Sequence, residues 1–171
     1  MKLKIGPTFS NVLFYCAFML LFTGYSFAQQ NPIYRLTDDN TQAQGRSAQV
    51  IANYPEDLLF NLESSIYIKN NAVLNTYGST APKVIKVKDS QSLNFLYTYN
   101  ELYNEVEMIT INLKSLSDLS SPFDVDSIRG FSHLKYIYLK CEFPISESQI
   151  RAFIQNADTE ISIFYKNINR S

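Results

Sequence analysis

The chain is poor in the residues that most metal and nucleophile sites require. Among its 171 residues there is one histidine, His133, and there are two cysteines, Cys16 and Cys141. A structural zinc site needs four Cys or His ligands, so a zinc cluster is excluded. A Cys141–His133 dyad also fails, because the two residues flank one predicted strand and would lie about 26 Å apart in extended chain. We therefore expect neither a metal nor a cofactor.

Glycine is scarce as well. The sequence has five glycines, and only Gly45, Gly78 and Gly130 follow residue 28. A phosphate-binding loop needs several closely spaced glycines, so this kind of site is excluded. A pair of carboxylates is not excluded, because its separation in space decides whether it can act as acid and base. The sequence therefore favours a chain that is not an enzyme, and a small exported hydrolase with a carboxylate site is the alternative.

Long apolar runs are absent after the first thirty residues. The single run, residues 12–22, follows Lys2 and Lys4 and precedes the small residues Ser26 and Ala28. It is shorter than the roughly 20 residues that a membrane-spanning helix needs. The pattern is typical of a signal peptide cleaved after Ala28, with an uncleaved anchor as the alternative. We expect a periplasmic or extracellular protein with no membrane insertion after cleavage.

Neither sign of charge dominates the chain. Loss of Lys2 and Lys4 would leave 13 of the 15 basic residues against 16 acidic ones, and would move the formal charge from −1 to −3. This balance gives no indication of a nucleic-acid partner, and we expect none. Cys141 would be the only thiol left, so we expect no internal disulfide. It ends a strand pattern, where a buried thiol behaves as a small hydrophobic residue.

An alternating pattern recurs five times along the chain. Each copy is an apolar–x–apolar triplet that begins with isoleucine, which predicts a strand with one buried and one solvated face. All the gaps are long enough for the crossovers that parallel strands need. Two gaps carry helix signals, one from Ser90 and one at the capping box Ser146–Gln149. The triplets are Ile66-Tyr67-Ile68, Ile85-Lys86-Val87, Ile109-Thr110-Ile111, Ile137-Tyr138-Leu139 and Ile161-Ser162-Ile163.

These segments resemble leucine-rich repeats over residues 63–168. The stretch VEMITINLKSL has apolar residues at the family's positions, from Val106 to Leu116, and the stretch from Glu63 has Asn71 at the family's asparagine position. Other units carry Lys114, Glu142 and Lys166 there instead. The resemblance implies an α/β solenoid of about five parallel strands, with helices or irregular crossovers on one face and an open face on the other. The alternative is an antiparallel α+β two-layer sandwich.

The predicted organisation has three parts. Residues 1–28 are the signal peptide, residues 29–62 are an N-terminal cap, and residues 63–171 are the repeat-like domain, which forms one globular unit with the cap. Within the cap we expect a strand at Ile33–Leu36 and a helix from Ser47 toward Asn53.

The open face of the predicted sheet follows from the alternation. With the isoleucines inward, lysines and tyrosines point outward, and tyrosine is a common interface residue. We expect a non-enzymatic module that binds a protein partner, or alternatively a glycan, through this face. A structural envelope component is a further alternative, in which the face is merely solvated. No oligomeric state is indicated. The predicted binding residues are Tyr67, Lys69, Lys86, Lys88, Thr110, Asn112, Tyr136, Tyr138, Lys140 and Phe164.

Overall fold

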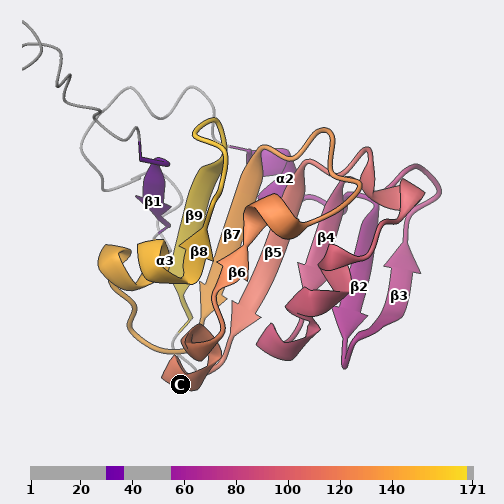
Figure 1. Cartoon of the computed structure of the whole chain (residues 1–171). Helices are drawn as coiled ribbons and strands as arrows, with labels where there is room; N and C mark the ends of the chain where they lie inside the picture. The colour runs from indigo at the N-terminus through magenta and orange to yellow at the C-terminus, as the bar shows by residue number, and fades with distance from the viewer. Residues whose placement is uncertain (1–29, 37–54, 169–171) are drawn as a thin grey trace, which may run out of the picture.

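The alternating segments form neighbouring parallel strands of one sheet. The computed structural model describes residues 30–36 and 55–168. Across the sheet, each strand of the series pairs in parallel with the next one along the chain (Figure 1). The antiparallel sandwich is therefore wrong. The series consists of β2 (Ser65–Lys69), β4 (Val84–Val87), β5 (Met108–Leu113), β7 (Tyr136–Cys141) and β9 (Ser162–Asn167).

Two further strands complete the sheet at its edges. β1 (Ile33–Arg35), the strand predicted in the cap, pairs in parallel with β9. β3 (Ala72–Tyr77) pairs antiparallel with β2. Among the described residues the order is β1-β9-β7-β5-β4-β2-β3, so the fold is α/β with a mixed, mostly parallel seven-stranded sheet. The role of residues 29–62 as a cap stays a prediction.

One row of isoleucines runs across the whole parallel part of the sheet. All six members are buried, which places the hydrophobic core on this face. The fifth triplet was predicted from Ile161, but Ile163 occupies the row and β9 begins at Ser162. A slip of two residues keeps every side chain on its face, so the alternation alone could not detect it. The row consists of Ile33, Ile163, Ile137, Ile109, Ile85 and Ile66.

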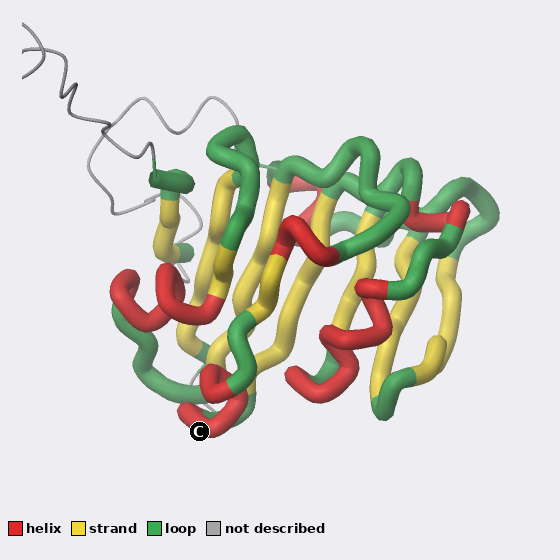
Figure 2. The backbone as a smooth tube through the Cα atoms, viewed as in Figure 1, coloured by secondary structure: helices red, strands yellow, loops and turns green. Residues whose placement is uncertain are grey.

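The crossovers lie on the isoleucine face of the sheet. Figure 2 shows their short helices and loops in front of the strands. α3 (Glu147–Phe153) begins at the predicted Ser146–Gln149 capping box. The segment predicted as a helix from Ser90 forms short 3-10 helices instead, with Asp89 as the first cap. The remaining crossover elements are η2 (Ser90–Tyr97), η3 (Glu101–Tyr103), η4 (Leu116–Ser120), η5 (Val125–Ser127) and the small pair β6 (Phe123–Asp124) and β8 (Ile154–Gln155).

A tight hairpin separates β2 from β3. Asn70 and Asn71 both have positive φ, 52° and 54°, as a two-residue type I′ turn requires. Asparagine tolerates this left-handed region better than most residues. Asn71 is therefore a turn residue that leads into an antiparallel strand. Its assignment to the asparagine position of a leucine-rich unit stays a prediction.

The opposite face of the sheet is partly covered by a short helix, α2 (Glu56–Phe60), which lies behind the strands in Figure 1. Its Leu58 and Leu59 pack on a second apolar cluster that includes Val84 and Met108. The predicted signal peptide and the helix predicted from Ser47 lie outside the described residues. Among the helices that the structure describes, none is long and apolar enough to cross a membrane.

Candidate binding face

The second face of the sheet divides into an apolar half and a basic half. Toward the amino ends of the strands, α2 covers Val84 and Met108. Toward the carboxyl ends, four lysines point from neighbouring strands. We call Lys86, Lys88, Lys140 and Lys166 the lysine cluster. Lys140 and Lys166 are paired positions of β7 and β9, and Asn112 of β5 is paired with Lys140 on its other side.

Three of the predicted face residues are buried, so their expected exposure is wrong. Thr110, Tyr138 and Phe164 are 4%, 3% and 2% exposed. Tyr138 and Phe164 belong to the apolar cluster that Leu58 and Leu59 of α2 pack against. The local alternation could not reveal that a distant helix covers this half of the face. The other predicted residues keep accessible surface; they are Tyr67, Lys69, Lys86, Lys88, Asn112, Tyr136 and Lys140.

The lysines are held against tyrosine rings. Lys86 Nζ lies 5.1 Å from the centre of the Tyr67 ring and donates a hydrogen bond to its hydroxyl at 3.2 Å. Lys88 Nζ lies 4.8 Å from the same ring centre, and Lys140 Nζ lies 5.4 Å from that of Tyr138. Cation–π contacts of this kind hold an ammonium group in place without neutralising it. The face therefore presents fixed positive charge.

The electrostatic environment of Lys140 is unfavourable to its own charge. Partial burial lowers the pKa of its ammonium group, and the positive charges of Lys88, Lys86 and Lys166 lower this pKa further. Within the described ranges, Lys86, Lys88 and Lys140 form no ion pair with a carboxylate. An anion bound among these lysines would offset their mutual repulsion.

A hollow of about 330 Å³ lies where the apolar half meets the lysine cluster. Leu59 and Phe60 of α2 form one side, and Lys140 and Lys166 form the other. Asn167 also lines it, but by the alternation of β9 its side chain lies on the isoleucine side, where the buried Oδ1 atom has no hydrogen-bond partner among the described residues. The ammonium groups of Lys140 and Lys166 make the hollow suited to a negatively charged group.

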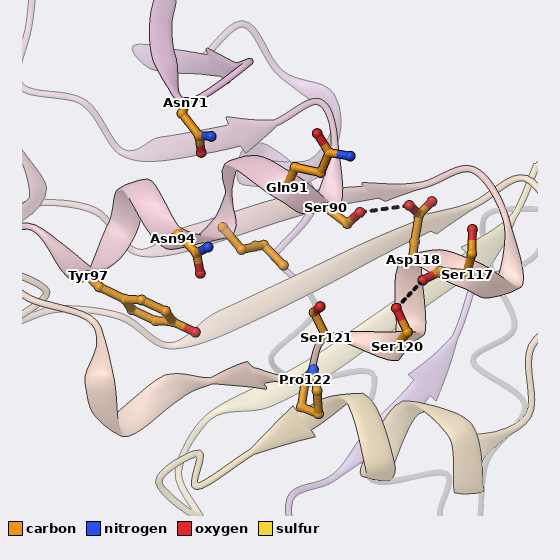
Figure 3. A pocket seen from close by; sticks show the side chains of 11 residues that line it. Asn71, Ser90, Gln91, Asn94, Tyr97, Ser117, Asp118, Ser120, Ser121 and Pro122 are labelled. Atoms are coloured by element: carbon orange, nitrogen blue, oxygen red, sulfur yellow. Dashed lines mark hydrogen bonds between the residues drawn. The ribbon is translucent and has the colours of Figure 1, made fainter.

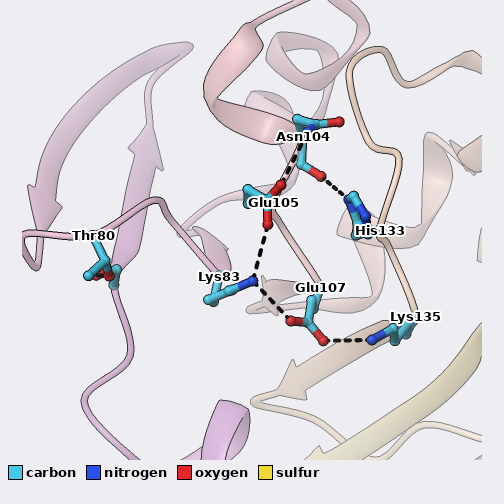
Figure 4. A network of polar contacts seen from close by, with 8 residues as sticks. Thr80, Lys83, Asn104, Glu105, Glu107, His133 and Lys135 are labelled. Atoms are coloured by element: carbon cyan, nitrogen blue, oxygen red, sulfur yellow. Dashed lines mark hydrogen bonds and ion pairs between the residues drawn. The ribbon is translucent and has the colours of Figure 1, made fainter.

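The amino ends of the same strands show a balanced arrangement (Figure 4). Glu107 lies between Lys83 and Lys135, with Glu–Lys distances of 3.2 and 2.9 Å, and Glu105 lies 3.4 Å from Lys83. The hydrogen bond from Lys135, reinforced by that from Lys83, lowers the pKa of the Glu107 carboxyl group although burial opposes the shift. Each charge here has a partner, so this network is structural.

The residues considered for catalysis are not assembled into a site. Cys141 is buried on the core side, and burial raises the pKa of its thiol to about 12, which keeps it protonated; its predicted burial is confirmed. His133 is exposed and donates from Nδ1 to the backbone carbonyl of Asn104 at 2.7 Å. In the part of the chain that the structure describes, no three His, Cys, Asp or Glu side chains form a metal-binding group.

One contributor to the basic half was missing from the sequence-based set. Lys166 shares the alternation of Ser162 and Phe164, so extending the strand pattern by two residues would have found it. Asn167 points to the other side of β9 by the same alternation and does not belong to the basic half. Comparison with protein-family descriptions, with curated proteins and with solved structures found no match to this chain.

Proposed function

We propose that this protein is a non-enzymatic binding module whose lysine cluster binds an acidic segment of a partner protein. The observation that carries the proposal is the set of three lysines, Lys86, Lys88 and Lys140, that share one surface without a carboxylate partner among the described residues. Charge complementarity steers such partners together and selects against basic ones.

The spacing of the cluster fits an extended peptide. Neighbouring strands lie about 4.8 Å apart, so positions on β4, β5, β7 and β9 span about 14 Å across the sheet. An extended segment covers this distance with about four residues. Acidic side chains along such a segment would reach the lysines, while the tyrosines beside them supply rigid contact area at little entropic cost.

We also propose that the parallel strands are successive units of a leucine-rich-repeat-like solenoid. Their arrangement in chain order and their common isoleucine row support this reading. The export signal at residues 1–28 belongs to the same proposal, with a partner located in the periplasm or outside the cell.

The test is a titration of the purified protein with a fluorescent decaglutamate peptide at low salt. The charge reversal Lys88→Glu with Lys140→Glu should weaken binding by about 30-fold or more, because it replaces attraction by repulsion at two positions. The matched control is Arg35→Glu with Arg129→Glu, which changes the net charge equally at exposed positions outside the cluster. This control should change affinity by less than about threefold.

The outcomes separate the competing interpretations. Equal weakening by both double variants would mean that only net charge matters, and would refute a site at the lysine cluster. An absence of binding by the unaltered protein would also refute the proposal, and would leave the structural-component and hydrolase alternatives for the chain. A neutral Gly-Ser peptide of the same length should not bind.

A further inference from the structure

A second hollow, of about 480 Å³, lies on the crossover side of the molecule, away from the lysine cluster. Figure 3 shows it between the β2–β3 turn, which carries Asn71, the helix η2 with Gln91 and Asn94, and the segment around Ser121. Its size falls within the roughly 300–1,000 Å³ of small-molecule sites.

Hydrogen bonds fix one wall of this hollow. Asp89 Oδ1 accepts from the backbone nitrogen and the hydroxyl of Ser92 at 3.0 and 2.7 Å, and its Oδ2 accepts from the backbone nitrogen of Asn70 at 3.1 Å. Ser92 Oγ in turn accepts from the backbone nitrogen of Asn71 at 2.9 Å. The hairpin turn is thereby attached to the start of η2, so Asn71 and Gln91 keep a fixed relative position.

The opposite wall is fixed by Asp118. Its Oδ1 accepts from Ser90 Oγ at 2.7 Å, and its Oδ2 accepts from the backbone nitrogens of Lys114 and Ser115 at 2.6 and 3.1 Å. Burial opposes ionisation of this carboxyl group, but these hydrogen bonds outweigh burial and lower its pKa. The hydrogen bonds of this carboxylate join η4 to η2. The lining of the hollow contains no basic residue.

The groups left for a ligand are neutral and polar. The side-chain amides of Asn71, Gln91 and Asn94 form no hydrogen bond with any described residue, although all three line the hollow. Each amide offers two donor hydrogens and an acceptor oxygen. The Tyr97 hydroxyl accepts from the backbone nitrogen of Asp124 at 3.3 Å and keeps its own proton for donation. In Figure 3 this hydroxyl points toward Ser121.

A ligand that matches this set must be uncharged and must both donate and accept many hydrogen bonds. Sugar hydroxyls do so, and adjacent hydroxyls of a pyranose can take both ends of one amide. The Tyr97 ring, stacked at 16° to Phe123, is held in a fixed orientation and offers apolar surface to the C–H groups of a sugar ring. We propose that this hollow binds a neutral oligosaccharide through Asn71, Gln91, Asn94 and Tyr97. This site is separate from the lysine cluster and does not depend on it.

The experiment is an NMR titration of the isotope-labelled protein, purified after expression of the whole sequence. The probes are cellotriose, maltotriose and diacetylchitobiose, each at up to about 20 mM, so that millimolar binding is detectable. We expect saturable shifts of backbone amides in residues 90–97 and 117–122 with at least one probe. The variant Gln91→Ala with Asn94→Ala should weaken that binding about tenfold, because several hydrogen bonds are lost.

Two further variants serve as a control outside the hollow and as a second amide deletion within it. Asn104→Ala deletes an exposed amide outside the hollow and should leave the affinity unchanged. Asn71→Gly removes an amide while glycine retains the positive φ of the turn, and should weaken binding without unfolding the hairpin. Saturable shifts elsewhere, binding that survives the Gln91 and Asn94 deletions, or no shift with any of the three sugars would overturn the proposal.

Discussion

The two ends of β4, β5 and β7 carry the same pattern of lysines with one difference in the middle. At the amino ends Lys83 and Lys135 flank Glu107, which pairs with both. At the carboxyl ends Lys88 and Lys140 flank Asn112, which carries no charge. The carboxylate of Glu107 neutralises the lysines at the amino ends, whereas Asn112 leaves Lys88 and Lys140 without a neutralising charge between them.

We interpret the difference as a separation of a structural role from a proposed recognition role within one sheet. Surface ion pairs contribute little free energy each, but they neutralise the field of the charges they join. We propose that leaving the middle position neutral preserves that field for a partner. Partial burial lowers the pKa of Lys140, and repulsion from the neighbouring lysines lowers it further. We therefore expect changes at the amino ends to alter stability more than peptide binding, and changes at the carboxyl ends to alter peptide binding more than stability.

The largest effect should come from the buried isoleucine row, which supports both ends of the strands. Ile109 is fully buried in the central strand of the isoleucine row. Ile109→Ala should lower the free energy of unfolding by about 3 kcal/mol, measured by urea denaturation, with Ile109→Val losing about 1 kcal/mol. The protein that remains folded should still bind decaglutamate with unchanged affinity. A folded variant that has lost binding would contradict the view that the isoleucine row acts on stability and the lysine cluster on binding.

The next largest effect should come from making the carboxyl ends resemble the amino ends. Asn112→Glu places a carboxylate beside Lys140, its paired position on β7. Decaglutamate affinity should fall about 10- to 50-fold, because the new carboxylate competes for the lysines. Asn112→Gln adds the same length without charge and should bind as the unaltered protein does. Equal binding by the two variants would disprove the role of the lysines as the recognition element.

The reverse change should act on stability alone. Glu107→Gln leaves Lys83 and Lys135 with weaker partners and should cost about 1 kcal/mol at neutral pH, since these side chains are partly exposed. The lowered pKa of Glu107 stabilises the fold above its ordinary value of 4.5, and this contribution is lost as the pH falls through the lowered value. Urea denaturation at several pH values should show the difference disappearing in acid. A marked change in peptide affinity would not fit.

The smallest effect should be a gain of stability at the carboxyl ends. Lys140→Met removes a partly buried charge and its repulsion with Lys86 and Lys88, and should stabilise the fold by about 0.5 kcal/mol at pH 7. Because the pKa of Lys140 is lowered on folding, the unaltered protein gains stability as the pH rises through that value, so the gain of the variant should shrink in alkali. A loss of stability at pH 7 would mean that the contact of Lys140 with the Tyr138 ring outweighs burial and repulsion.

The sequence predicted the face of each strand residue better than it predicted exposure. Alternation placed Tyr67 and Lys86 together because period two is a local property of extended chain. It could not show that Leu58 and Leu59 cover Tyr138 and Phe164, since that contact depends on a helix far away in the sequence. The polar hollow could not be predicted from the sequence either, because Asn71 and Asn94 come from different segments, the β2–β3 turn and η2, that only the fold brings together.

The most direct test of the account is an NMR titration of the Lys140 ammonium group with and without decaglutamate. We expect a pKa below the ordinary lysine value of 10.5 in the free protein, and an upward shift of this pKa when the peptide binds. A Lys140 pKa that stays unchanged while the peptide binds would place the peptide elsewhere and contradict the assignment of the lysine cluster as the binding site.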